Sequence, residues 1–219
     1  MRLLLSAALA LTIGAGAAIA QAPPNATEPG LPMLALTNVP AKGAVNLTVT
    51  TPAFKSGGDI PFENTQYQGN KFPGLEWTKG PAATKSYAII MQDTDGIRNS
   101  MPILHWTMFN IPASMTKLDA GMTTPPAGSA YGPNVRAPAQ PYMGPRTPAG
   151  PKHRYHIQMF ALDTTVDPTK TYDEILASMK DHVLASGEVI GLGQVDPSAP
   201  PRPPAPAATP AAPTTAPAN

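Results

Sequence analysis

Short apolar segments separated by turn residues recur along the middle of the chain. Every second residue from Val45 to Val49 is apolar, so an extended strand would place these side chains on one face. Compact apolar blocks follow at Ser86 to Met91 and at Leu104 to Ile111. Blocks of this length, bounded by Gly, Pro, Asn and Asp, are typical of buried strands. The pattern predicts a mainly β fold.

A further strand is predicted from His153 to Leu162, and it matters for chemistry because side chains alternate across a sheet. His153 and Tyr155 then share one face, which would point into a pocket at the start of the strand. Arg154 lies on the other face, where we expect a structural ion pair. His156 and His182 are predicted to be surface or packing residues.

One helix is predicted near the C-terminal end, at about Tyr172 to Ser186. Thr171 and Glu174 have the spacing of a capping box, and Gly187 follows as a stop signal. Apolar residues recur at helical spacing on one side of this segment: Ile175, Leu176, Met179, Val183 and Leu184.

The two ends of the chain differ from its middle. Residues 1–20 have the pattern of an export signal, with Arg2, an apolar stretch and small residues before an expected cut after Ala20; an uncleaved membrane anchor is the alternative. Residues 21–40 and 197–219 are rich in Pro and Ala and are predicted to be extended tails. A single domain is expected between residues 41 and 196. The chain would then be periplasmic or secreted.

Composition excludes some classes of function. Arg2 is the only charged residue of the signal segment, so the chain after it has equal numbers of basic and acidic residues. Nucleic-acid-binding proteins usually carry a basic excess or a basic patch, so no nucleic-acid partner is expected. The chain has no cysteine, which excludes disulfides and thiolate metal sites. No cofactor and no metal are predicted, and a monomer or weak homodimer is expected.

Two segments, Asp93 to Trp106 and Tyr142 to Tyr155, contain the residues of a candidate polar pocket. Acids and histidines occur in them at strand ends beside Gly/Pro loops, where a β fold usually forms such a pocket. The alternatives are structural: the two acids could form an Asx turn, and the first histidine could be a core residue. The candidate ligand-binding residues are Asp93, Asp95, His105, Tyr142, Gly144, Pro145, His153 and Tyr155. Arg146, in the second segment, could add a cation at the pocket mouth.

From about Thr51 to Gly193 the chain resembles the phosphatidylethanolamine-binding protein family, in its bacterial Raf kinase inhibitor-like branch. The first family signature matches Asp93 to Gly96, with Thr94 and Gly96 at positions where the family has proline, followed by His105-Trp106 and Asn110-Ile111-Pro112. The second signature matches Tyr142, Gly144, Pro145, Pro148 and Gly150, followed by His153-Arg154-Tyr155.

This resemblance implies packed antiparallel sheets and a small anion pocket for phosphate or a phospholipid head group, without catalysis. Membrane lipid or a protein are further possible partners. His105 and His153 would donate hydrogen bonds to the anion, with backbone N–H groups around Gly144 and Gly150. Asp93 would orient and charge a histidine. The alternatives are a protein-interaction module, such as a protease or kinase-type inhibitor, and a hydrolase that uses the Asp/His cluster.

Overall fold

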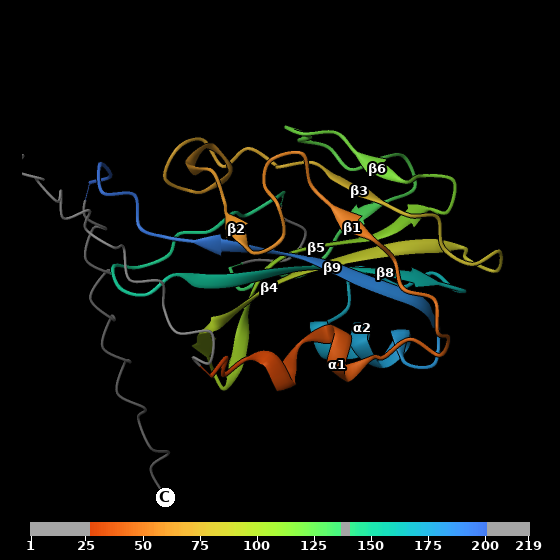
Figure 1. Cartoon of the computed structure of the whole chain (residues 1–219). Coiled ribbons are helices and arrows are strands. Elements are labelled where there is room, and N and C mark those ends of the chain that lie inside the picture. The colour runs from red at the N-terminus through yellow and green to blue at the C-terminus, as the bar shows by residue number, and fades with distance from the viewer. Residues whose placement is uncertain (1–26, 137–140, 201–219) are drawn as a thin grey trace, which may run out of the picture.

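Two sheets form the body of the protein in the computed structural model, which describes residues 27–136 and 141–200 (Figure 1). The larger sheet has the order β2-β9-β8-β4-β5-β7 and the smaller one the order β1-β3-β6. All strand pairs are antiparallel except β2 with β9. The larger sheet contains β2 (Gly58–Asp59), β4 (Ser86–Arg98), β5 (Met101–Pro112), β7 (Ala130–Tyr131), β8 (His153–Leu162) and β9 (Val183–Gly193); the smaller contains β1 (Val49–Thr50), β3 (Leu75–Trp77) and β6 (Lys117–Leu118). The predicted mainly β fold is confirmed.

Both faces of the larger sheet are covered, which explains why β4 and β8 are apolar on both sides. Tyr87, Ile89 and Met91 of β4 pack toward the smaller sheet, in one core cluster with Trp77. The residues between them pack toward α1 (Ala35–Asn38) and α2 (Tyr172–Met179), which lie on the opposite face (Figure 1). Alternation along β4 and β8 therefore determines which side chains reach each face at the strand ends.

The C-terminal helix is shorter than predicted. α2 has the expected capping box between Thr171 and Glu174, but it ends at Met179. Asp181 then takes a positive φ of 64°, which reverses the chain. The predicted second half, with Val183 and the residues after it, is strand β9, which pairs with β8 along its length. The prediction of a helix to residue 186 was wrong because burial in this segment alternates with a period of two.

The segment before residue 41 is also different from the prediction. We call residues 27–40 the N-terminal strap: it contains the short helices η1 (Leu31–Met33) and α1, and it packs on the larger sheet. Leu34, Ala35 and Val39 are buried, so the expected extended tail was wrong for this part. The predicted signal segment 1–20 and residues 201–219 of the predicted C-terminal tail lie outside the described residues.

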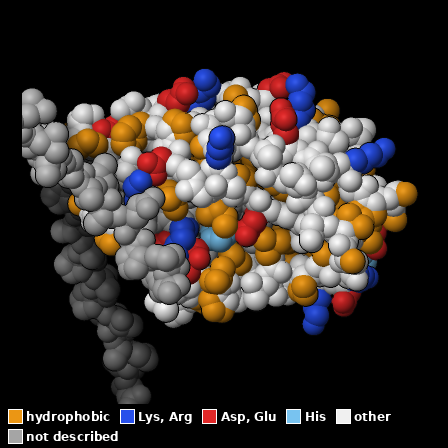
Figure 2. Space-filling model, in the orientation of Figure 1, with side chains coloured by type: hydrophobic (Ala, Val, Ile, Leu, Met, Phe, Trp, Pro, Cys, Tyr) orange, Lys and Arg blue, Asp and Glu red, His pale blue; other side chains and the backbone are white. Residues whose placement is uncertain are grey.

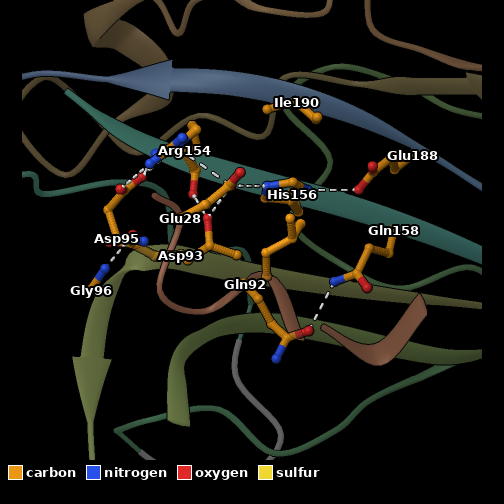
Figure 3. A network of polar contacts seen from close by, with 12 residues as sticks. Glu28, Gln92, Asp93, Asp95, Gly96, Arg154, His156, Gln158, Glu188 and Ile190 are labelled. Atoms are coloured by element: carbon orange, nitrogen blue, oxygen red, sulfur yellow. Dashed lines mark hydrogen bonds and ion pairs between the residues drawn. The ribbon is translucent and has the colours of Figure 1, made fainter. Parts of the chain in front are cut away.

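Buried polar side chains hold the strap to the sheet (Figure 3). The amide of Ala35 donates to Gln92 Oε1 at 2.9 Å, and the amide of Leu36 donates to Gln158 Oε1 at 2.8 Å. His156 lies between Glu28 of the strap, at 2.6 Å, and Glu188 of β9, at 2.7 Å. Because His156, Gln92 and Gln158 are almost fully buried, the strap satisfies groups that would otherwise lose their hydrogen bonds.

Charges of both signs lie close together on the face shown in Figure 2, and no large area of that face is uniformly basic. Among the described residues, no helix is long and apolar enough to cross a membrane.

Candidate functional site

A cavity of about 670 Å³ opens where β4, β5 and β8 meet the loops at one end of the larger sheet. Four of the eight residues predicted from the sequence line it: Asp93, His105, His153 and Tyr155. Asp93 and Tyr155 are directly paired between β4 and β8, on the face that carries the core shared with the smaller sheet. Strand pairing and alternation therefore bring Asp93, His153 and Tyr155 together, and the shared face of His153 and Tyr155 is the one predicted from the sequence.

Asp93 lies at the bottom of the cavity and is 2% exposed. Its Oδ1 accepts the backbone N–H groups of Asp95, at 3.0 Å, and Gly96, at 2.8 Å. The Asx turn considered as a structural alternative is therefore present. The second oxygen, Oδ2, is 2.8 Å from His153 Nδ1. Asp93 thus holds the backbone of Asp95 and Gly96 and contacts His153 at the same time.

His153 is partly exposed in the cavity and donates Nδ1–H to Asp93. This hydrogen bond is the main reason why the pKa of His153 is raised, and it outweighs the opposing effect of burial. A raised pKa favours the imidazolium, in which both ring nitrogens are donors. Nε2–H is then free of the Asp93 contact and can donate to an anion.

His105 owes its position to a β-bulge. Met91 pairs with Trp106 and Gln92 with Leu104, so His105 is the extra residue between them. The bulge lets His105 line the cavity while its neighbour Trp106 stays in the core. Burial lowers the pKa of His105, and its Nδ1 lies 3.2 Å from the carbonyl oxygen of Met143. Because a carbonyl only accepts, Nδ1 carries the proton and the neutral ring leaves Nε2 as an acceptor.

Tyr155 closes one side of the cavity, with its ring edge-on to the ring of His105 at 5.1 Å between centroids. Its hydroxyl lies 3.0 Å from Thr147 Oγ1. Burial raises the pKa of Tyr155, with Asp93 adding to the effect, so the hydroxyl stays protonated and can act as a donor.

Asp95 does not line the cavity. Its carboxylate accepts three hydrogen bonds from Arg154, from the backbone N–H, Nε and Nη2, on the other side of the sheet (Figure 3). Burial favours the neutral acid, but these bonds outweigh it and lower the pKa of Asp95. The structural ion pair predicted for Arg154 is present, with Asp95 and, at 3.5 Å, Glu28 as partners.

Tyr142, Gly144 and Pro145 do not line the cavity themselves. They form the wall segment around Met143, which does line it. Tyr142 is buried in the aromatic core, and its hydroxyl donates to the Asn64 carbonyl. Gly144 N–H donates to Asn70 Oδ1 at 2.7 Å, so it is not available to an anion. A β-carbon at Gly144 would lie 2.3 Å from the Asn64 oxygen, which explains the glycine. This wall places the Met143 carbonyl that orients His105.

Four further polar residues line the cavity at its mouth, and only one of them, Arg146, was considered as a pocket residue from the sequence. The others come from loops and strand ends with no distinguishing motif. The four are Gln66, Arg98, Arg136 and Arg146.

Most of the described part of the chain is similar to known proteins. A family model for phosphatidylethanolamine-binding proteins matches residues 50–194. A UPF0098 protein of Methanothermobacter thermautotrophicus is 37% identical over 153 residues, which is 67% of this chain and 97% of that protein. The UPF0098 protein YbcL of Escherichia coli is 39% identical over 106 residues, which is 46% of this chain and 57% of YbcL.

The solved structures point the same way. The crystal structure of E. coli YbcL, described as a new member of the mammalian PEBP family, aligns with a TM-score of 0.62 and 26% identity and covers 69% of this chain and all of that one. A phosphatidylethanolamine-binding protein homologue from Chlamydia trachomatis aligns with the same TM-score at 27% identity, over 69% of this chain and 99% of that one. The chain belongs to the phosphatidylethanolamine-binding protein family.

Proposed function

We propose that the cavity binds a phosphate or phosphorylated group and does not transform it. The observation that carries the proposal is the Asp93–His153 pair, in which a buried carboxylate favours the charged form of a partly exposed imidazole at the bottom of a cavity. Imidazolium N–H and tyrosine O–H groups are good donors to an oxyanion. The family's characteristic ligand, a phospholipid head group, carries such an anion.

The contacts of the Asp93 carboxylate favour binding without catalysis. Both of its oxygens accept hydrogen bonds from the protein, which leaves it poorly placed to activate a water molecule as a general base. The charge of Asp93 acts instead on His153.

We expect His153→Gln to weaken phosphate binding by about tenfold or more, because a charge-assisted hydrogen bond contributes about 1.5–3 kcal/mol and a neutral amide cannot replace it. Isothermal titration calorimetry of the purified full chain with inorganic phosphate at pH 6.5 measures this. His182→Gln is the matched control, since His182 is an exposed histidine paired with Asp163 outside the cavity. Equal phosphate affinity in the His153 variant and the wild type would reject the proposal.

We also propose that the chain is exported and that residues 1–20 are removed as a signal. The order of a basic residue, an apolar stretch and small residues supports this. A relative from Mycobacterium tuberculosis, 29% identical over 150 residues, bears the name "Putative lipoprotein LppC". Intact mass of the protein recovered from outside the cytoplasm should match a chain that begins at Gln21. A mass that includes Met1 or residues just after it would contradict the cut.

A further inference from the structure

The basic residues that line the cavity are arginines, and the lysines lie elsewhere. All nine lysines lie within the described residues, and none of them lines the cavity. Three of the six arginines do: Arg98, Arg136 and Arg146. A guanidinium has a planar set of donors that matches phosphate and carboxylate, whereas an ammonium is a point charge. The cavity mouth therefore holds the kind of cation suited to directional contacts with anions.

Two of these arginines are held by one residue. Arg136 Nη2 donates to Gln66 Oε1 at 2.8 Å, and Arg146 Nη1 donates to the Gln66 backbone oxygen at 3.3 Å. Gln66 is itself fixed, because its Nε2 and backbone N–H donate to the carbonyls of Gly144 and Pro145. Arg146 also lies over the Tyr67 ring, at 4.9 Å from the centroid. Two guanidinium groups from separate segments are thus gathered on one side of the mouth.

No carboxylate balances this pair within the described part of the chain. Neither Arg136 nor Arg146 has an acidic side chain within ion-pair distance there. The one acid that lines the cavity, Asp93, is buried and already accepts three hydrogen bonds. Gathering like charges costs stability unless an anion joins them. An ammonium group would meet repulsion at the same place.

We propose that the cavity selects ligands with two anionic groups, the first at the Asp93–His153 pair and the second between Arg136 and Arg146. This inference rests on the proposed function and makes it narrower, because a zwitterionic head group such as phosphoethanolamine would place its ammonium against the arginines. A volume of about 670 Å³ is within the range of sites for small organic ligands and exceeds what one phosphate needs.

Three phosphate esters of similar size test the inference, since they differ in the charge of the second group. We would titrate the full chain by calorimetry with 2-phosphoglycolate (anionic), ethyl phosphate (neutral) and phosphoethanolamine (cationic). We expect affinity to fall in that order, by about tenfold or more from first to last. In the Arg136→Gln/Arg146→Gln double variant the three affinities should come within about twofold. Lys180→Gln, which removes one exposed positive charge at the far end of α2, is the control and should keep the wild-type order.

The outcomes separate this inference from the proposed function. If ethyl phosphate binds and needs His153, but phosphoethanolamine binds as tightly as 2-phosphoglycolate, the anion site stands and the two-anion inference is overturned. A preference for 2-phosphoglycolate that survives in the double variant also overturns it, because the arginines would then not be responsible. If none of the three esters binds, both proposals fail together.

Discussion

We expect Asp93→Ala to be the most damaging single substitution in the cavity, for stability and for anion affinity together. Alanine leaves the N–H groups of Asp95 and Gly96 without their acceptor and leaves His153 without its partner. Each unsatisfied buried group costs about 1–3 kcal/mol, so the free energy of unfolding should fall by about 3 kcal/mol. Anion affinity at pH 7 should fall by more than about tenfold, because His153 would lose the partner that raises its pKa and favours its charged form.

Asp93→Asn separates these two effects. The asparagine oxygen can still accept the two backbone N–H groups of the Asx turn, so most of the stability should return. The negative charge that raises the pKa of His153 is absent, so affinity should stay low. In the wild type, affinity should fall as pH rises through the raised pKa of His153; in the Asp93→Asn variant the same fall should occur at lower pH.

The measurement is a set of titrations with sulfate, which does not titrate in the range from about pH 5 to about pH 9, together with urea unfolding of each variant followed by tryptophan fluorescence. If sulfate affinity has the same pH profile in Asp93→Asn and in the wild type, Asp93 does not raise the pKa of His153.

The second large effect concerns His156, which joins the N-terminal strap to the sheet. Both ring nitrogens face carboxylates, Glu28 at 2.6 Å and Glu188 at 2.7 Å, so the ring makes both contacts as a donor only when it is protonated. Burial opposes the charge, but the hydrogen bonds and charges of Glu188 and Glu28 outweigh it and raise the pKa of His156.

The direction of the pH effect follows from this raised pKa. Protonated His156 is favoured in the folded state, so its contribution to stability is complete below the unfolded pKa of about 6.5 and is lost as pH rises through the folded value. His153 acts in the same sense, because its pKa is also raised. His105 acts in the opposite sense, because burial lowers its pKa. We therefore expect the His156 contribution to be visible only by comparison with a variant.

His156→Gln should lower the free energy of unfolding by about 3 kcal/mol at pH 6, because a glutamine amide that donates to one of the two carboxylates turns its oxygen, an acceptor, toward the other. The difference from the wild type should shrink above the raised pKa, where the wild-type ring is neutral. Urea unfolding at several pH values measures this. His153→Gln is measured in parallel, because the pKa of His153 is also raised. A difference between His156→Gln and the wild type that is constant with pH would contradict the charged bridge.

The sequence was sufficient for the parts of the fold that depend on short apolar segments. The segments that became β4, β5 and β8 have the length and the apolar content of buried strands, and the resemblance to the family covers the same residues. The end of α2 was not predictable in this way. A helical stripe from Ile175 to Leu184 coexists with a strand pattern that starts at Val183, and only pairing with β8 decides between them.

In the candidate site, too, the local sequence pattern predicted some residues, and long-range contacts placed the others. His153 and Tyr155 were found because they share one face of a predicted strand, and Asp93 because it stands at the end of the apolar block that became β4. The bulge that turns His105 into the cavity, and the contacts of Gln66 with two distant arginines, depend on partners far away in the sequence. Asp95 was misplaced because the irregular part of β4 between Asp93 and Ile97 directs its carboxylate to Arg154, on the other side of the sheet.

The strap has a consequence for where this domain begins. The family match starts at residue 50, yet Gln92, His156 and Gln158 inside the matched part depend on hydrogen bonds from residues before it. A chain trimmed to residues 50–194 would keep every cavity residue and still uncover a row of polar groups at the centre of its sheet. We therefore expect the unit that folds to include the strap, which lies before the matched residues 50–194 and satisfies polar groups on the sheet face beneath it.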